Sequence, residues 1–160
     1  MPNWCSNELV IFEKDTKIAE KIWKEITNDD CELDFEMIIP IPDDPAYKDE
    51  PNQQEAKKSP HWWYNWNVEN WGTKWNACDS DSYWDGIDTI EFIFNTAWSP
   101  PTPIVRALAE KYPTSLIGLF YREEGMGFQG SLVLRGDEVI EEKEIDTCMT
   151  RSDMEWLKQE

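Results

Sequence analysis

Short apolar runs alternate along this chain with apolar positions at helical spacing, which predicts alternating strands and helices. Residues 9–12 form a β-rich run that is apolar on both faces. Residues 16–27 place four apolar side chains on one side, as an amphipathic helix does, with Asp15 or Thr16 as the capping residue. A second strand is predicted over residues 33–39, and Pro40 and Pro42 end it.

The second half of the chain repeats this alternation. The pattern predicts a strand over 89–96, a helix that begins near Thr102 and ends at Pro113, strands over 115–122, 128–135 and 139–145, and a helix over 151–158. The order is β-α-β, a long insertion, then β-α-β-β. We therefore predict an α+β fold: a ferredoxin-like split β-α-β antiparallel sheet with extra C-terminal strands, as a single domain over 1–160.

The insertion spans residues 40–86 and has two parts. Residues 40–58 form an acidic, proline-rich loop, and residues 59–84 form a tryptophan-rich segment with a short helix expected over 60–70. Three of the predicted strands are apolar on both faces, so both faces of the sheet need cover. We expect the two helices on one face and residues 60–84 on the other.

Five of the ten tryptophans fall within fourteen residues, interleaved with asparagines: Trp62, Trp63, Trp66, Trp71 and Trp75. An indole is a large apolar ring with one N–H that needs a partner. Such a segment either fills a core or lines a binding site for a flat ligand, a sugar or an extended peptide. Both interpretations remain open at this point.

The strongly negative net charge restricts the kinds of partner that the protein can bind. There are 33 acidic residues against 15 lysines and arginines, a net charge of −18, and the acids gather in two runs at 29–55 and 137–146. A field of this sign repels phosphate backbones and anionic membranes, so we expect neither direct nucleic-acid binding nor membrane binding. It attracts a basic groove on another protein. The plainer interpretation is that the acids keep the protein soluble.

The cysteines lie far apart, at Cys5, Cys31, Cys78 and Cys148, without metal-ligand spacing. No export signal precedes the first strand, which indicates a cytosolic protein with reduced thiols, no disulfide and no bound metal. The single histidine, His61, excludes a histidine-rich metal site. Cys78 with His61 is the one pair with the composition of a nucleophile and a base, although their spacing does not support catalysis.

Two further motifs fail on context. Residues 125–130 spell GxGxxG, but they lead into a strand instead of a helix, so we interpret them as a hairpin turn. Residues 79–86 resemble a calcium loop but lack its glycine and glutamate at the required positions, so we expect an acidic surface turn. Neither motif predicts a cofactor.

Four strings carry a family resemblance: MPNWCSN (1–7), WNVENWGTKWNA (66–77), FNTAWSPP (94–101) and YREEGMGFQG (121–130). With them the chain resembles a family of uncharacterised plasmid- and phage-borne proteins with a YubB-type ferredoxin-like domain. The resemblance implies that fold and a mobile-element origin. It implies no activity and no catalytic residues.

The same strings suggest one binding site at the ends of the strands. We expect a pocket of indoles, amides, one lysine and one carboxylate, formed by Asn3, Trp4, Asn7, Asn70, Trp71, Lys74, Trp75, Asn95, Trp98, Tyr121 and Glu123. Lys74 either marks the anionic end of a ligand or merely pairs with Glu69 or Glu123.

The leading functional hypothesis is a non-enzymatic cytosolic binding protein of a phage, plasmid or integrated element. Its partner would be a host protein with a basic surface, with the acids acting as a decoy for a nucleic acid. The alternative is a binder of a small molecule or peptide through the tryptophan and asparagine site, and the third is an enzyme of unassigned reaction. A decoy requires acids on one face, whereas a ligand site requires the indoles to gather.

Overall fold

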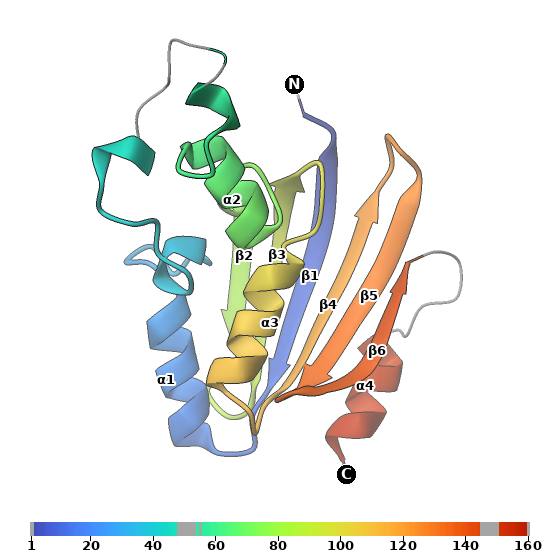
Figure 1. Cartoon of the computed structure of the whole chain (residues 1–160). Coiled ribbons are helices and arrows are strands. Elements are labelled where there is room, and N and C mark those ends of the chain that lie inside the picture. Colours follow the sequence, from blue (N-terminus) through green and yellow to red (C-terminus); the bar gives the residue numbers. More distant parts are fainter. Residues whose placement is uncertain (1, 48–53, 55, 145–150, 160) are drawn as a thin grey trace.

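A six-stranded antiparallel sheet forms the body of the molecule (Figure 1). The computed structural model describes residues 2–47, 54, 56–144 and 151–159. In chain order the main elements are β1 Trp4–Phe12, α1 Thr16–Ile26, α2 Trp63–Trp71, β2 Cys78–Trp84, β3 Thr89–Ala97, α3 Thr102–Lys111, β4 Leu116–Glu123, β5 Phe128–Arg135, β6 Glu138–Glu144 and α4 Arg151–Lys158.

The strand order is β2-β3-β1-β4-β5-β6, and every neighbouring pair is antiparallel. The first four strands have the order of a ferredoxin-like sheet, in which α1 connects β1 to β2 and α3 connects β3 to β4. β5 and β6 extend the sheet beyond β4. The predicted α+β, ferredoxin-like fold with extra C-terminal strands is confirmed.

The second strand of this plan is β2, and the strand predicted over residues 33–39 is wrong. That segment makes one isolated bridge, between Thr27 and Leu33, and then the short 3-10 helix η1 over Phe35–Met37. The Asp34 carboxylate accepts hydrogen bonds from the Glu36 amide and from Asn76 Nδ2. These local bonds offer the backbone an alternative to a sheet ladder.

β2 itself falls where an acidic surface turn was predicted, and that prediction is also wrong. β2 is an edge strand, and its residues alternate between half-buried and exposed. Only one face of such a strand packs on the protein, so the other face carries the exposed Asp79, Asp81 and Tyr83. Its Trp84 stacks on Trp23 of α1, with ring centroids 6.1 Å apart.

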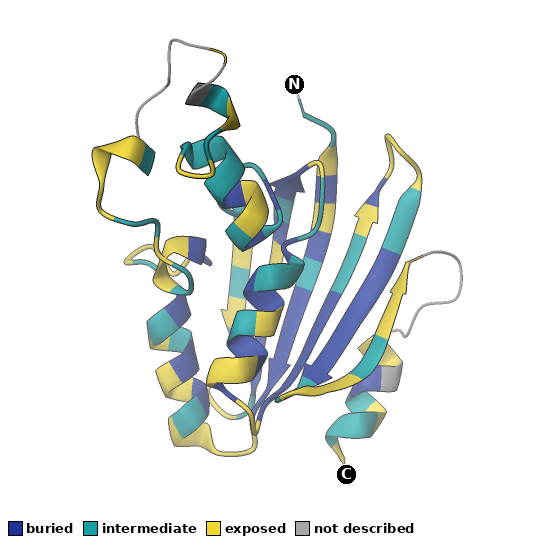
Figure 2. Cartoon of the chain, viewed as in Figure 1, coloured by how far each residue is buried: buried dark blue, intermediate teal, exposed yellow. Residues whose placement is uncertain are grey.

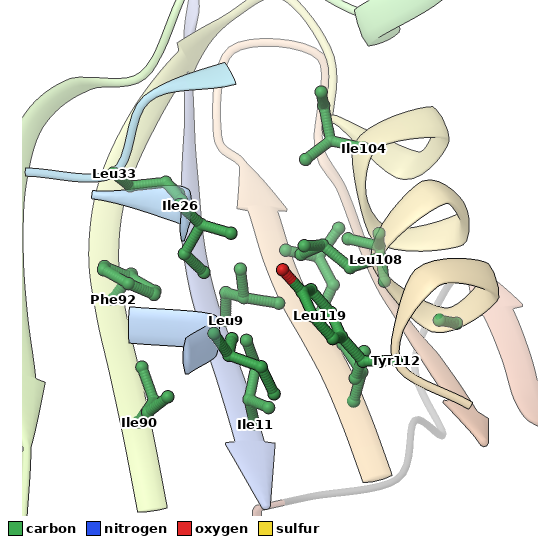
Figure 3. Packing of buried hydrophobic residues seen from close by; sticks show 14 of the residues in the cluster. Leu9, Ile11, Ile26, Leu33, Ile90, Phe92, Ile104, Leu108, Tyr112 and Leu119 are labelled. Carbon is green, nitrogen blue, oxygen red and sulfur yellow. The ribbon is translucent and has the colours of Figure 1, made fainter. Parts of the chain in front are cut away.

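The main core lies between the sheet and the helices α1, α2 and α3 (Figures 1 and 3). Strand register aligns two apolar rows across it: Phe92, Leu9, Leu119 and Leu132, then Ile90, Ile11, Ile117 and Leu134. Trp71 of α2 belongs to this same cluster. The prediction that residues 60–84 cover the opposite face is therefore wrong, while the placement of α1 and α3 on one face is confirmed.

The opposite face is covered in part by α4. A smaller cluster of buried apolar residues lies there: Val10, Phe12, Leu116, Val133 and Met154. Met154 packs so closely on Gly118 that a Cβ at that glycine would lie 2.5 Å from its sulfur. The inner strands are largely buried while β6 is mostly exposed (Figure 2).

Candidate functional site

The tryptophan-rich segment divides into one core anchor and one row of partly exposed rings. Trp71 is the anchor: it is 2% exposed, and its indole N–H donates to the Ile39 carbonyl at 2.8 Å. Its ring lies edge-on to Phe35 at 5.8 Å and to Trp66 at 5.7 Å. Trp71 therefore fixes α2 on the sheet, and it belongs to the core instead of a binding site.

Gly72 ends α2 in the left-handed conformation, with φ of 78° and its N–H bonded to the Val68 carbonyl. A Cβ there would lie 2.6 Å from Pro103 Cδ of α3, so only glycine fits. Ser99 Oγ donates to the Gly72 carbonyl at 2.5 Å, and Thr73 Oγ1 donates to the Ala97 carbonyl at 2.9 Å. The NWGT and AWSPP strings thus bind each other and hold the end of α2 against the start of α3.

Four rings and two lysines form a continuous series, which we call the aromatic row: Lys57, Trp62, Tyr64, Lys74, Trp75 and Trp4. The Trp62 and Tyr64 rings stack at 5.2 Å with an 18° angle between their planes. Lys74 Nζ lies 5.0 Å from the Tyr64 ring and 4.7 Å from the Trp75 ring. The Trp75 ring then lies 6.1 Å from that of Trp4.

The cations of the aromatic row are held by ring faces. Lys57 Nζ lies 5.8 Å from the Trp62 ring, and Lys74 lies between two rings. Lys74 pairs with neither Glu69 nor Glu123 among the residues that the structure describes. Asn67 lies beside it on α2, 4% exposed, with Nδ2 donating to the Lys74 carbonyl at 2.8 Å. The Asn67 bond ties the loop that carries Lys74 and Trp75 to the helix.

Three of the predicted site residues are buried and satisfied inside the protein. Asn7 is 2% exposed and donates to Thr96 Oγ1 at 2.9 Å. Glu123 is 1% exposed, and its carboxylate accepts the amides of Gly125 at 2.6 Å and Met126 at 2.8 Å. The third is Trp71, described above. The carboxylate of Glu123 occupies the turn of the GxGxxG string, which confirms the hairpin and leaves those two amides already bonded.

The other predicted residues disperse around the same end of the sheet. Trp98 is 43% exposed, and its amide donates to the Asn3 carbonyl at 2.9 Å. Asn70 bonds within α2, and Asn95 bonds to Asp79 at 3.4 Å. Tyr121 lies on β4 with its ring edge-on to Phe128 at 6.2 Å. The structure brings Trp4, Lys74 and Trp75 together, while Asn7, Trp71 and Glu123 are buried among other residues of the protein.

Sequence reasoning missed Tyr64 and Lys57 as members of the row. Tyr64 lies inside the tryptophan cluster, so the density of rings was the available signal. Its partner Trp62 is the extended N-cap residue of α2, which lets residues two apart stack. Helical spacing pairs residues three or four apart, so it does not predict this contact.

Parts of the two acidic runs lie at opposite edges of the sheet. Residues 31–35 of the first run lie beside β2 in space. Ser82 Oγ donates to the Cys31 carbonyl, and Ser80 Oγ accepts the Leu33 amide at 3.4 Å. The second run lies on β6, the other edge strand. Asp49, Glu50, Glu55, Asp146 and Lys48 lie outside the described residues. The acids beside β2 and those on β6 are therefore separated by the width of the sheet.

The thiols of Cys5 and Cys78 are not activated. Burial raises the pKa of Cys5 to about 12, against the effect of a hydrogen bond with Thr96. Burial also raises the pKa of Cys78, and the adjacent Asp79 adds to this. A nucleophile needs the opposite shift. Cys5, Cys31 and Cys78 are free, and Cys148 lies outside the described residues.

The described residues contain neither a cluster of metal-ligand side chains nor a helix that could span a membrane. No three His, Cys, Asp or Glu side chains there gather as a metal site would require. No helix among the same residues has the length and apolar character to cross a bilayer. His61 packs against the Tyr47 ring at 5.1 Å, away from any such cluster.

Comparison with known proteins gives a family and a fold. The family model described as the ferredoxin-like domain in Api92-like protein matches residues 70–157. The crystal structure of the protein api92 from Yersinia pseudotuberculosis is similar, with a TM-score of 0.61 and 8% sequence identity, covering 94% of this chain and 100% of that one. A search of the curated proteins finds no match. At this identity the likeness extends to the fold alone.

Proposed function

The chain belongs to the family with the ferredoxin-like domain of Api92-like protein, and from this premise we propose that it is a non-enzymatic protein-binding module. In this proposal the aromatic row is the contact surface, and the partner is a protein that presents an extended segment with basic side chains. The mobile-element origin and the cytoplasmic location suggested by the sequence belong to the same proposal.

The observation that carries the proposal is the exposure of the row outside the core. Trp62, Tyr64, Lys74 and Trp75 are half-buried, and Trp4 is 39% exposed. A core would hide such rings, as it hides Trp71. Tryptophan and tyrosine present large, rigid contact areas with a polar edge, and they dominate the energy of many protein interfaces. Rings in a row suit an extended peptide, whose side chains and backbone pack between them.

Charge selects the kind of partner. The whole chain carries −18, so association with a basic protein is accelerated and association with nucleic acid is opposed. The decoy role, in which the acids themselves mimic a nucleic acid, receives less support. It needs acids on one face, whereas residues 31–35 of the first run lie beside the edge strand β2 and the second run includes the opposite edge strand β6. In this proposal the rings of the aromatic row contact the partner, and the acids attract its basic surface by long-range electrostatics.

The test is capture from bacterial lysate at low and high salt, followed by affinity measurement with the purified partner. The variants are Trp75→Ala and Lys74→Met, with Trp156→Ala on α4 as the matched control because its side chain is 64% exposed and outside the row. We expect a basic partner that is retained at low salt and lost at high salt. Trp75→Ala should weaken binding at least about tenfold while the melting temperature changes little.

Two outcomes contradict the proposal. One is that no basic protein is retained at low salt. The other is that Trp75→Ala and Lys74→Met bind the partner as tightly as the parent does. If Lys74→Met instead unfolds the protein with unchanged affinity of the folded fraction, Lys74 only pins the loop against Tyr64 and the rings alone form the surface.

A further inference from the structure

A small cavity at the end of the sheet where β1 finishes is lined by positive side chains, although the molecule as a whole is strongly negative. It has a volume of about 340 Å³, and its lining residues are Phe12, Lys14, Thr114, Leu116, Arg135 and Lys158. Three of the six carry a positive charge and none carries a negative one. In a chain with 33 acids and 15 lysines and arginines, this is a local excess of cations.

The fold assembles this cavity from four separate segments. Register across β1, β4 and β5 aligns Phe12 with Leu116 and Leu116 with Arg135. Lys14 lies two residues after the end of β1, and Lys158 is the last residue of α4. Lys158 Nζ lies 4.4 Å from the Phe12 ring and bonds to Asp88 Oδ1 and Thr89 Oγ1, both at 3.2 Å. The cations thus surround an apolar floor.

Two of these cations lack an anion of their own. Within the described ranges, neither Lys14 nor Arg135 forms an ion pair. Glu13 is engaged elsewhere, because it accepts Thr114 Oγ1 at 2.7 Å and Ser115 Oγ at 2.6 Å. Asp88 pairs with Lys158, the third cation of the cavity, and also accepts Thr89 Oγ1. Asp137 and Glu138 line a neighbouring cavity that shares Arg135. Unpaired cations beside so many acids are available to an external anion.

We infer that this cavity binds a small organic phosphate monoester. The phosphate lies toward Lys14, Arg135 and Lys158, and the organic part covers Phe12 and Leu116. The volume suits a compact ligand, at the small end of the range for protein sites. Arginine and lysine donate charge-assisted hydrogen bonds to phosphate, and the apolar floor favours a ligand that is more than the inorganic ion.

The experiment titrates the full chain with inorganic phosphate and with phenyl phosphate, at constant ionic strength kept with chloride. Isothermal titration calorimetry measures the affinity, and amide chemical shifts show where each compound binds. The variants are Lys14→Gln and Arg135→Gln. The matched control is Arg122→Gln, which removes an exposed arginine at the opposite end of the sheet.

We expect phenyl phosphate to bind more tightly than inorganic phosphate and to shift the amides of Thr114 and Leu116. Each cavity variant should lose about tenfold in affinity, and the control should lose none. Equal affinity for both compounds would limit the site to the bare anion and overturn the monoester assignment. Equal weakening by all three variants would mean that the compounds only screen the net charge, which would overturn the site. A loss of stability with unchanged affinity would mean that the cations have a structural role only, which would also overturn it.

Discussion

At the scale of single residues, this chain uses polar side chains mainly to hold its own backbone. Glu123 caps a hairpin, Asp34 caps a 3-10 helix, and Asn7 joins two strands, each through hydrogen bonds inside the protein. These residue types also make binding sites, which is why sequence alone grouped Asn7 and Glu123 with a ligand pocket. The physical difference is burial with all partners supplied, and a single sequence does not display it.

Gly72 offers a sharp test of local geometry. Gly72→Ala forces a left-handed alanine and brings its Cβ against Pro103, so we expect a loss of more than roughly 2 kcal/mol in the free energy of unfolding. Gly86→Ala is the matched control: its φ is also 78°, but nothing lies within 4 Å of a Cβ there. The control should lose about 1 kcal/mol. Equal losses by urea denaturation would show that the contact with α3 is unimportant.

Tyr112 and Glu25 connect α3 to α1 through a hydrogen bond from phenol to carboxylate. This bond, with help from Lys111 and Lys21, lowers the pKa of Glu25 despite its partial burial, and burial raises the pKa of Tyr112. A lowered carboxyl pKa stabilises the fold above the unfolded value of about 4.3 and loses that effect as pH falls through the folded pKa. Tyr112→Phe should therefore cost about 1 kcal/mol at neutral pH and less under acid conditions.

The measurement for this bond is urea denaturation at pH 7 and near pH 3.5. Tyr83→Phe is the matched control, because its ring is 57% exposed. A deficit for Tyr112→Phe that stays constant across this pH range would contradict the role of the Glu25 charge.

At the scale of elements, the helices α1, α3 and α4 and the strands of the second half follow from apolar periodicity. The predicted and observed bounds of the strand at 128–135 and the helix at 151–158 coincide. Edge and loop segments were mispredicted. β2 has only one half-buried face, and residues 33–39 carry buried Leu33 and Phe35 on a turn that Asp34 and Asn76 hold. In both cases tertiary contacts override the local pattern.

The α4 helix should contribute a large part of the second core. Met154 is fully buried against Gly118, so Met154→Ala leaves a cavity and should cost about 2–4 kcal/mol. Trp156→Ala on the same helix removes a side chain that is 64% exposed and should change stability little. Thermal and urea denaturation measure both variants. If Met154→Ala is as stable as the control, α4 does not close this face in solution.

At the scale of the whole molecule, the net charge of −18 opposes compaction. The two edge strands carry six of the 33 acids, two on β2 and four on β6, and charged edges discourage pairing with other sheets. We expect the melting temperature to rise by a few degrees as sodium chloride increases to about 0.3 M, because salt screens the repulsion. The double variant Glu138→Gln with Glu144→Gln should show a smaller rise. A melting temperature independent of salt would contradict a destabilising field.

The site could be predicted only in outline at this scale. The density of tryptophan and asparagine singled out residues 59–84, and the structure places Lys74 and Trp75 of this segment near one another and Trp75 beside Trp4 of β1. The division into Trp71 as an anchor and the aromatic row as a surface depends on which face α2 presents to the sheet. That choice rests on Trp71 reaching the Ile39 carbonyl, thirty-two residues away, and no local pattern encodes it.

The position of β1 in the sheet has a consequence for biosynthesis. β1 lies between β3 and β4, so residues 4–12 find their partners at 89–97 and 116–123. During translation the first strand is made long before either neighbour, and its Leu9–Phe12 run is apolar on both faces. A nascent chain of this kind exposes an unpaired, apolar and aggregation-prone strand for several seconds at ordinary elongation rates of about 5–20 residues per second. The yield of the protein in cells should therefore depend on chaperones that shield residues 4–12 until residues 89–123, which contain the partner strands, have been synthesised.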